Sequence, residues 1–359
     1  MTEHSKAQMK AATPYEQKQL QRFNVEWQVV PPMPREVLFD LNTHCNHRCF
    51  FCSNHRIAER IFMDKDLMLR LMRECREFGV TDIGLYATGE PFLRRDLAEI
   101  VRFAKDFGFS YIFITTNGAL ATPARAKEVI DAGIHSIKFS INAGNRESYR
   151  MVHGKDDFDK VIRHLRWCHQ YRTANKVDVK LYVSMVPTHV TGGQWEQLLA
   201  LVGDCVDGSS LRHCSNQGGN MLENNQTETI DSKNLLGSLP AGLAQGGRCP
   251  DPFYRVVITP EGYLTNCVVD YQNALCVADL RTTTLKDAWG NEHARRLRTA
   301  HLEGKLEGLI CDCCLTNTGA PFKPIRPELA RPSRKPPRRI IEMNKRCEEA
   351  TASYGKRPS

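Results

Sequence analysis

The chain has 359 residues, of which 41% are hydrophobic and 25% charged, an ordinary composition for a globular protein. This length exceeds one small domain and suits a core of about 200 residues with a smaller attachment. No apolar run approaches the roughly 18 residues that span a membrane. The polar residues 1–6 lack the apolar region of a secretory signal. We therefore expect a cytoplasmic protein without a membrane partner.

Strand-like and helical patterns alternate from residue 37 to residue 202. Apolar runs are followed by amphipathic helical runs. The strands are expected at 37–41, 82–86, 111–115, 136–141, 177–186 and, more weakly, 210–214, and the helices at 65–78, 97–107, 123–132, 158–170 and 194–202. Repeated strand–helix units predict an α/β fold with a parallel sheet, open or curled into a barrel. In such folds the chemistry gathers at the carboxyl ends of the strands.

Changes in composition divide the chain into four segments. After the barrel pattern, residues 254–259 and 263–267 predict a β-hairpin and residues 285–298 a helix. A short helix is also expected near residues 14–23. The predicted segments are an N-terminal extension 1–33, a barrel core 34–225, a linker with a small α+β domain 226–320, and a basic, proline-rich tail 321–359.

The net charge of +8 is concentrated in the tail. Residues 323–339 contain seven Lys or Arg against one acid, so the rest of the chain is close to neutral. Five prolines in the same stretch predict an extended, solvated tail. This uneven distribution argues against nucleic acid as a partner. It leaves an acidic partner, phosphates or solubility alone as the role of the tail.

Fourteen cysteines are many for a cytoplasmic chain, in which metal ligation is commoner than disulfides. Three of them, Cys45, Cys49 and Cys52, follow the first strand at the spacing C-x3-C-x2-C. Three thiolates hold three of the four irons of a cubane cluster and leave one iron open for a substrate. The alternative is a zinc site, completed by one of the nearby histidines His44, His47 and His55.

A second set of cysteines lies in the predicted small domain. Cys249, Cys267, Cys311 and Cys314 stand at intervals of 18, 44 and 3 residues. Four thiolates are enough to ligate all the irons of a second cluster, although a four-cysteine zinc site also fits these intervals. Cys313 lies inside the last pair and could exchange with a neighbour.

The first cysteine spacing, with Phe51 just before the third cysteine, resembles the signature of the radical S-adenosylmethionine (SAM) enzymes. The second set, with Gly262 five residues before Cys267, resembles the twitch domain, a shortened SPASM domain. The resemblance implies a partial (β/α)6 barrel followed by a small α+β iron–sulfur domain. It also implies SAM, one SAM-binding 4Fe–4S cluster, one auxiliary 4Fe–4S cluster, and an external electron donor such as flavodoxin or ferredoxin.

The resemblance further implies residues that contact the cofactor. Residues 88–91 resemble the G-G-E-P motif that receives the amino group of SAM, with Thr88 in place of its first glycine. A carboxylate suits an ammonium group, and glycine permits close backbone approach. The predicted cofactor contacts are Phe51, Thr88, Gly89, Glu90, Pro91, Asn117, Ser140 and Asn142.

The layout with one auxiliary cluster resembles the radical SAM alcohol dehydrogenases that act on aminocyclitols in butirosin biosynthesis. A fully ligated auxiliary cluster can accept an electron. We therefore expect oxidation of a hydroxyl-bearing carbon in a small, carbohydrate-like substrate. The alcohol must also lose a proton to a base, for which His213, Arg212 and His189 are the candidates.

Three other functions stay open. Epimerisation would use a cysteine thiol as hydrogen donor, with Cys214 best placed and Cys205 and Cys168 as weaker candidates. Maturation of a ribosomally made peptide is common among enzymes with SPASM-type domains, although residues 1–33 are too few for a precursor-binding domain. A non-enzymatic metal-binding scaffold would bind its partner through the basic tail.

Overall fold

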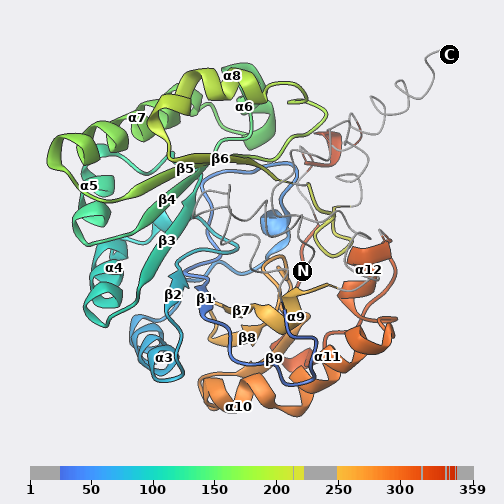
Figure 1. Ribbon diagram of the computed structural model, residues 1–359. Coiled ribbons are helices and arrows are strands. Elements are labelled where there is room, and N and C mark those ends of the chain that lie inside the picture. The colour runs from blue at the N-terminus through green and yellow to red at the C-terminus, as the bar shows by residue number, and fades with distance from the viewer. Residues whose placement is uncertain are drawn as a thin grey trace, which may run out of the picture.

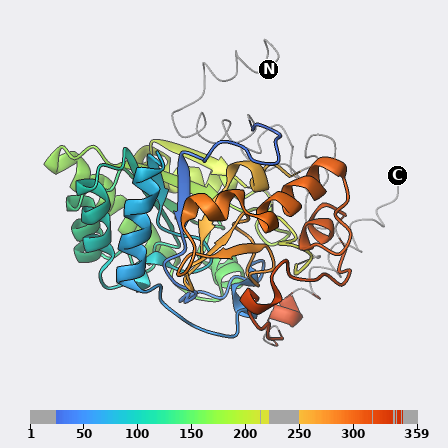
Figure 2. The same ribbon diagram turned by 90° about the horizontal axis from the view of Figure 1, so that it is seen from below.

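The computed structural model describes residues 25–212, 214–221, 249–316, 318–335, 338, 340–343 and 345. In these ranges nine strands form one sheet in the order β6-β5-β4-β3-β2-β1-β7-β8-β9 (Figure 1). The sheet curls, and helices cover its outer side, as the view from below also shows (Figure 2). The helix expected near residues 14–23 lies outside the described ranges. Among the helices described, none has both the length and the apolar character needed to cross a membrane.

Six strands in chain order, each parallel to its neighbour, make the first part of the sheet. They are β1 (Glu36–Phe39), β2 (Asp82–Gly84), β3 (Tyr111–Thr116), β4 (Ser136–Ser140), β5 (Lys180–Met185) and β6 (Gly208–Leu211). The helices between them are η1 (Ser53–Arg56), α3 (Lys65–Glu77), η2 (Pro91–Leu93), α4 (Leu97–Asp106), α5 (Pro123–Asp131), α6 (Arg146–His153), α7 (Phe158–Asn175), α8 (Trp195–Val202) and η3 (Gly203–Cys205). This arrangement confirms the predicted partial barrel.

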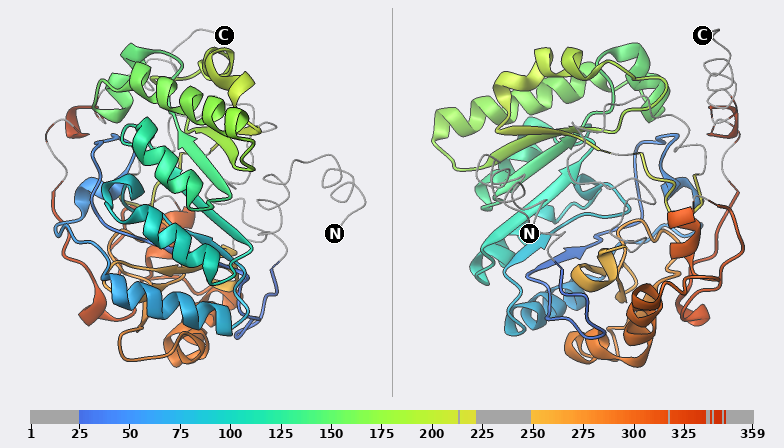
Figure 3. Two further views of the ribbon diagram at one scale, coloured as in Figure 1. Left: turned by 90° about the vertical axis from the view of Figure 1, so that its left-hand side faces the viewer. Right: turned by 45° about the vertical axis from the view of Figure 1, so that its right-hand side comes forward.

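Helices α3, α4, α5 and α7 lie side by side on the outer face of the sheet (Figure 3). Alternate residues of a strand point to opposite faces. The outward ones, such as Ile112, Ile137 and Leu181, are fully buried in one core with the apolar faces of the helices. Burying an aliphatic side chain of this size contributes about 1.5–3 kcal/mol. The core therefore fixes the register of the strands and, with it, the residues at their carboxyl ends.

The inner face of the sheet carries a different set of side chains. A Cβ on Gly84 would overlap the ring of Phe113 on the neighbouring strand, so the small residue makes room for an aromatic one. Lys138 lies opposite Tyr182 in the pairing of β4 with β5. The Lys138 ammonium lies 5.9 Å from the centre of the Tyr86 ring. The barrel interior thus combines aromatic rings with a cation.

The sheet continues without a break into the C-terminal part of the chain. β7 (Val256–Ile258) pairs in parallel with β1, and β8 (Tyr263–Thr265) and β9 (Cys276–Asp279) follow antiparallel. The predicted hairpin is therefore present, but it extends the barrel sheet rather than forming a separate layer. The helices of this part are α9 (Asp251–Tyr254), α10 (Leu285–Gly290), α11 (Glu292–Glu303), α12 (Ile310–Thr316) and η7 (Pro327–Leu329).

The single helix predicted over residues 285–298 is in fact two, because Asn291 interrupts it. The backbone of Asn291 is extended, with a ψ of 170°. Its side-chain oxygen accepts a hydrogen bond from the Ala294 N–H at 2.8 Å, which caps α11. An Asn cap of this kind contributes about 1 kcal/mol. The apolar spacing continues through both helices, so the spacing alone did not predict the break at the capping residue Asn291.

The sixth strand and helix α6 also differ from the prediction. The sixth strand was expected at residues 210–214, but β6 pairs with β5 two residues earlier, ending at Leu211. Helix α6 was not expected at all. It begins at Asn145, whose side chain accepts from the Ser148 N–H, and ends at Gly154 in the left-handed conformation with a φ of 68°. Those two residues are the standard start and stop signals of a helix.

The expectation of an extended, solvated tail is wrong for residues 325–334, which we call the strap. The Arg331 side chain is 6% exposed, and its guanidinium pairs with Glu261 at 2.8 Å (Nη2 to Oε2). Its backbone N–H donates to the Gln272 carbonyl, and the N–H of Ile325 donates to the carbonyl of Ala274. The strap therefore packs against the C-terminal part of the sheet.

The end of the strap reaches the loop that carries the first cysteines. Ser333 pairs with Ile57 in an isolated β-bridge. The Arg334 backbone N–H donates to the carbonyl of Arg56, and its side chain donates to the carbonyl of His55 at 2.6 Å. Prolines and positive charge indicate a solvated tail on average, but here specific carboxylate and carbonyl partners hold the segment in place.

Candidate functional site

The loop after β1 brings three cysteines together at the carboxyl end of the strand. Cys45, Cys49 and Cys52 line one cavity of about 310 Å³. Arg60 and Arg334 line the same cavity and place positive charge beside the sulfurs. Three thiol ligands with neighbouring cations are a donor set that fits a cubane cluster with one open iron.

Burial raises the pKa of the thiols in this cavity. The pKa of Cys45 rises to about 12, because burial and the nearby Glu90 carboxylate both disfavour the thiolate. Burial also raises the pKa of Cys52, although a hydrogen bond with the Tyr271 hydroxyl acts in the opposite direction. Both thiols are therefore protonated at neutral pH in the metal-free protein, and metal binding would release their protons.

Residues 88–91 run alongside the chain that enters the cysteine loop. The Glu90 N–H donates to the His44 carbonyl at 2.7 Å, and the Asn42 amide donates to the Glu90 carbonyl at 3.1 Å. A Cβ on Gly89 would overlap the carbonyl oxygens of Asn42 and His44. Only glycine allows the two backbone segments to lie this close. The motif therefore fixes the entrance to the loop.

Thr88 stands where the related motif has glycine, and its hydrogen bonds with Asp40 explain why a threonine is present there. Its N–H donates to Asp40 at 3.0 Å, and its hydroxyl donates to the other oxygen of the same carboxylate. Asp40 lies just after β1 and is 1% exposed. Burial raises the pKa of its carboxyl to about 6. A glycine at position 88 would leave this buried carboxylate with one donor fewer.

Replacing Thr88 with valine should lower the free energy of unfolding by about 1.5–3 kcal/mol, the usual contribution of a hydrogen bond to a charged group. The loss should be largest above pH 6, since Asp40 is then ionised in the folded state. Thr115→Val is the matched control, because the buried Thr115 hydroxyl has no hydrogen-bond partner among the described residues. Urea unfolding at about pH 5 and about pH 8 measures both variants. Equal losses in the two variants would contradict the role given to Thr88.

Glu90 is a buried carboxylate held in a fixed position. It accepts hydrogen bonds from the Phe92 N–H, the Thr116 hydroxyl at 2.7 Å and the Asn117 N–H at 2.8 Å. Burial raises its pKa to about 6, and these donors partly oppose the rise. A carboxylate can accept about four hydrogen bonds. One position thus remains for an ammonium group, such as the amino group of SAM.

The other predicted cofactor contacts differ in their neighbours and hydrogen-bond partners. The Asn117 side-chain amide lies 4.0 Å from the sulfur of Cys45. Asn142 is 2% exposed; its Oδ1 accepts from the Val186 N–H at 2.8 Å, and its Nδ2 lies 3.4 Å from the Ser140 hydroxyl. Asn117 therefore borders the cysteine cavity, whereas the Asn142 side chain joins the ends of β4 and β5.

Two histidines lie beside Cys49: His47, a candidate zinc ligand from the sequence, and His153, which no motif indicated. His153 Nδ1 lies 3.3 Å from the Cys49 sulfur and 3.2 Å from His47 Nδ1, and the other His47 nitrogen lies 3.1 Å from Asp157. The ligand atoms of His47, Cys49 and His153 lie within 4.8 Å of one another, which could hold a zinc ion. However, the Asn142 N–H donates to His153 Nε2, so the proton of the neutral ring sits on Nδ1. A protonated nitrogen cannot ligate a metal, and His153 instead serves as a donor to the sulfur.

Phe51 and Cys214 share a small hydrophobic cluster beside the cysteine loop. Phe51 is 9% exposed and Cys214 3% exposed, and Cys49 and Cys52 pack against the same cluster. Cys214, the hydrogen donor of the epimerase alternative, is thus near the cysteine loop but surrounded by apolar side chains. The two weaker candidates, Cys168 and Cys205, belong to the main core.

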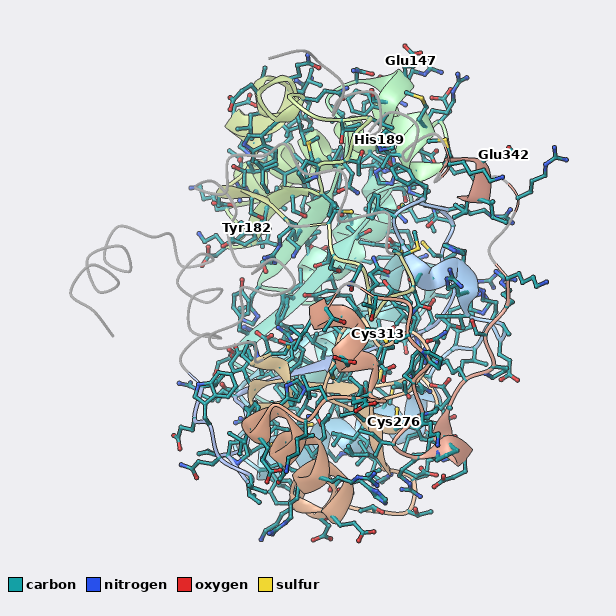
Figure 4. The ribbon with its side chains drawn as sticks, turned by 90° about the vertical axis from the view of Figure 1, so that its right-hand side faces the viewer. Glu147, Tyr182, His189, Cys276, Cys313 and Glu342 are labelled. Atoms are coloured by element: carbon teal, nitrogen blue, oxygen red, sulfur yellow. The ribbon has the colours of Figure 1, made fainter. Side chains whose placement is uncertain are left out.

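The candidate bases also differ. His213 lies outside the described residues. Arg212 follows β6, and its backbone N–H donates to the Met185 carbonyl at 2.8 Å. His189, labelled in Figure 4, is half-buried after β5, with its ring centre 5.5 Å from that of Phe50. Burial lowers its pKa, so its imidazole is neutral at pH 7 and can accept a proton.

Lys138 is an interior cation absent from the predicted site. It lies in the middle of β4, and Tyr182, opposite it on β5, is 4% exposed (labelled in Figure 4). A lysine on the inner face of a parallel strand is unusual, because such strands are mostly apolar. The lysine between the apolar residues of the predicted strand 136–141 is the signal in the sequence that could have identified this cation.

The second set of cysteines converges on one apolar cavity. Cys249, Cys267, Cys311 and Cys314 all line it, from the segments before α9 and after β8 and from α12. Burial raises the pKa of all four thiols, and repulsion from nearby acidic groups adds to the rise. Four converging sulfurs can ligate every iron of a cubane cluster, or a tetrahedral zinc ion.

Cys313 does not line that cavity. Its thiol donates to the Ala320 carbonyl at 3.2 Å. Figure 4 labels Cys313, which belongs to α12, and, lower in the view, Cys276 at the start of β9. The Asn216 amide holds the helix from the other side by donating to the carbonyls of Cys313 and Cys314. The geometry gives no support to an exchange of Cys313 with its neighbours.

Two family models match the chain. Residues 41–202 match the radical SAM superfamily. Residues 249–315 match SPASM, an iron–sulfur cluster-binding domain. The first match contains the C-x3-C-x2-C loop and residues 88–91, and the second contains the other four converging cysteines.

Curated relatives match a shorter part of the chain. A protein of Saccharolobus solfataricus named "Probable GTP 3',8-cyclase" is 36% identical over 135 residues, which is 37% of this chain and 43% of the relative. One of the same name from Metallosphaera sedula is 39% identical over 142 residues, which is 37% of this chain and 42% of the relative. The chain thus spans less than half the length of these curated relatives.

Solved structures share the fold at low sequence identity. BtrN in complex with AdoMet and 2-DOIA is 20% identical with a TM-score of 0.52, over 79% of this chain and 92% of BtrN. SuiB of Streptococcus suis, bound to precursor peptide SuiA, is 16% identical with a TM-score of 0.60, over 80% of this chain and 73% of SuiB. At these identities the likeness concerns the fold alone.

Proposed function

Because this chain belongs to the radical SAM enzymes and carries a SPASM-type iron–sulfur domain behind the radical SAM core, we propose that it oxidises a hydroxyl-bearing carbon of a sugar-like or cyclitol-like substrate. The two domains bring SAM and 4Fe–4S clusters, one of them auxiliary. When bound, these groups supply a carbon-centred radical that removes a hydrogen atom and an acceptor for one electron. The observation that carries the proposal is the apolar cavity lined by four cysteines.

We assign each set of cysteines to one cluster. The first set lines a cavity that holds three thiols, and the second set lines a cavity that holds four. The first would leave one iron open for the amino and carboxylate groups of SAM, with Glu90 beside it to receive the ammonium. The assigned ligands are Cys45, Cys49 and Cys52 for the SAM-binding cluster, and Cys249, Cys267, Cys311 and Cys314 for the auxiliary cluster.

The second cavity favours oxidation over other radical reactions. A cluster with four protein ligands has no open iron for a substrate, so electron transfer is the chemistry left to it. Conversion of a secondary alcohol to a ketone removes one hydrogen atom from carbon, one proton from oxygen and one electron. An electron acceptor inside the protein is therefore required for oxidation and is not required for epimerisation.

The inner face of the barrel offers groups for a hydroxylated substrate. Lys138 and Tyr182 present an ammonium and a hydroxyl group from neighbouring strands. Of the described candidate bases, Arg212 offers only hydrogen-bond donors and no acceptor atom. We therefore assign proton acceptance to His189, whose pKa is lowered by burial.

A second candidate is cyclisation of GTP, which the names of the curated relatives favour. The aromatic rings of Tyr86 and Phe113 beside the Lys138 ammonium would also suit a nucleobase and a phosphate. The match to those relatives covers 37% of this chain and 43% of the relative, so it does not carry the activity of the whole relative. For that reason oxidation is placed first.

Anaerobic reconstitution with iron and sulfide, followed by SAM and a reductant, tests the proposal. Hydroxylated sugars, cyclitols and GTP are supplied in parallel, and 5′-deoxyadenosine and product are measured. We expect deoxyadenosine above background together with a ketone from a hydroxylated substrate. A cyclised product from GTP would establish the second candidate instead. Deuterium incorporated at carbon in heavy water would establish epimerisation.

Replacing Lys138 with methionine should raise the KM for substrate roughly tenfold or more, since a hydrogen bond to a charged group contributes about 1.5–3 kcal/mol. The change keeps the length of the side chain and removes its charge. Lys180→Met is the control, because Lys180 on β5 is exposed and pairs with Asp178. Steady-state kinetics of both variants decide the point. An unchanged KM in Lys138→Met would remove Lys138 from the substrate site.

A further inference from the structure

Each thiol of the first cysteine loop has one polar side chain beside it, contributed by a different part of the chain. The pairs are Asn117 with Cys45 (4.0 Å), His153 with Cys49 (3.3 Å) and Tyr271 with Cys52 (3.4 Å). The first two neighbours come from the barrel. Tyr271 instead belongs to the SPASM-type domain, four residues after Cys267 in the sequence. One short loop therefore contacts both proposed cluster sites.

We propose that the Tyr271 hydroxyl donates a hydrogen bond to the Cys52 thiolate of the SAM-binding cluster and raises the reduction potential of that cluster. The SPASM-type domain would then contribute to the first step of the reaction as well as holding the auxiliary cluster. The inference rests on the assignment of Cys52 as a ligand, made above, and is independent of the substrate.

The direction of this hydrogen bond follows from the chemistry of the two groups. A metal-bound thiolate has no proton and can only accept a hydrogen bond. The Tyr271 side chain carries a phenolic O–H group, which can donate a hydrogen bond, and the residue is 7% exposed. The hydroxyl therefore donates to the sulfur.

The loop of Tyr271 is fixed by its own contacts. The Asp270 carboxylate accepts hydrogen bonds from the Thr265 hydroxyl at 2.9 Å and from the N–H groups of Ala274 at 2.7 Å and Leu275 at 2.8 Å. These three bonds close the loop between β8 and β9 around one buried carboxylate. Tyr271, next to Asp270, is therefore held in a single backbone conformation.

The strap holds the same loop from the outside. The Arg331 guanidinium donates to the Tyr271 carbonyl at 3.2 Å, and its backbone N–H donates to the Gln272 carbonyl at 2.8 Å. Glu261 holds the guanidinium in turn. Because the strap continues to His55 and Arg56, one segment connects the Tyr271 loop to the residues just after Cys52.

A second connection joins the cysteine loop to the SPASM-type domain. The Gln217 amide donates to the Phe51 carbonyl at 2.8 Å, and its oxygen accepts from the Ser53 N–H at 2.7 Å. Gln217 thus brackets Cys52 on both sides in the sequence. Asn216, the residue before it, bonds the backbone of α12. With two independent connections, the contact between Tyr271 and Cys52 has little freedom to open.

Hydrogen bonds to the sulfurs of a cluster are one of the means by which proteins set its potential. Reduction increases the negative charge on the thiolates, so a donor stabilises the reduced cluster more than the oxidised one. Removing the hydroxyl should lower the potential. We expect about a tenfold smaller ratio of reduced to oxidised cluster at a fixed potential, which is about 59 mV for a one-electron couple.

Tyr271→Phe in the full-length, reconstituted protein tests the proposal through an electron paramagnetic resonance redox titration. The SAM-binding cluster is recognised as the part of the spectrum that changes when SAM is added. Tyr263→Phe is the matched control, since the Tyr263 hydroxyl accepts from the Arg281 guanidinium at 3.4 Å and Tyr263 lines neither cysteine cavity. We expect a lower midpoint potential in Tyr271→Phe and an unchanged one in Tyr263→Phe. An unchanged midpoint in Tyr271→Phe with full iron content would overturn the proposal.

Two further proteins keep the test decisive. If Tyr271→Phe fails to hold iron, 3-fluorotyrosine at position 271 keeps the shape and strengthens the donor, so the midpoint should rise; no rise would overturn the proposal. Cys52→Ala tests the assignment on which it rests, by removing the SAM-sensitive signal. Persistence of that signal would show that the ligand assignment is wrong. If the wild-type protein shows the SAM-sensitive signal but the variants at position 271 have an unshifted midpoint potential, only the role of Tyr271 is refuted.

Discussion

Replacing Cys45, Cys49 and Cys52 together with alanine should abolish SAM cleavage by the reconstituted protein. The iron content should fall from about eight to about four atoms per chain, because each cubane cluster holds four irons. The three thiols line one cavity and the other four line a second one, so the loss should not spread to the auxiliary site. Iron analysis and the release of 5′-deoxyadenosine measure the two effects.

The control for this experiment removes three other cysteines. Cys75, Cys168 and Cys205 are buried in the main core and line neither cavity. Their combined replacement by alanine costs packing energy but should leave about eight irons and normal SAM cleavage. Release of 5′-deoxyadenosine by the variant that lacks Cys45, Cys49 and Cys52 would contradict the assignment of these three residues as cluster ligands. Zinc in place of iron in the wild-type protein would contradict the assignment of the two cysteine sets to iron–sulfur clusters.

The sequence predicted most of the barrel because its signals are local. An apolar strand followed by an amphipathic helix is readable within a short window, and α3, α4 and α5 begin at the residues expected for them. The pairing of β1 with β7 was not predicted, because no local pattern states which strand lies beside which. The same limit applies to β9, a short strand whose residues are recognisable only once β8 lies beside them.

The residues of the candidate site were also predicted only where they lie close together in the sequence. The cysteines of the first loop are close in sequence, so their spacing alone suggested a shared metal. His153 and Tyr271 lie 104 and 219 residues from the cysteines they contact, and nothing local indicated them. The strap was predicted wrongly for a related reason. Its composition describes a solvated tail, while its position depends on the distant carboxylate of Glu261.

Replacing Cys311 and Cys314 with alanine should separate radical formation from product formation. Both residues lie on α12 and line the auxiliary cavity, whereas the first cysteine loop stays intact. The iron content should fall from about eight to about four atoms per chain. Deoxyadenosine should still form with substrate present, while the ketone falls to background, because the substrate radical has no acceptor for its remaining electron.

Cys313→Ser is the matched control on the same helix. Its thiol lies off the cavity and donates to the Ala320 carbonyl, a bond that serine can also make. This variant should keep both clusters and full ketone formation. If the variant at Cys311 and Cys314 still made ketone at the wild-type rate, electron transfer to the auxiliary cluster could not be part of the oxidation. If the variant at Cys311 and Cys314 lost formation of both deoxyadenosine and ketone, the two cluster sites would be coupled before the radical forms. The contact of Tyr271 with Cys52 is the connection in the structure that could carry this coupling.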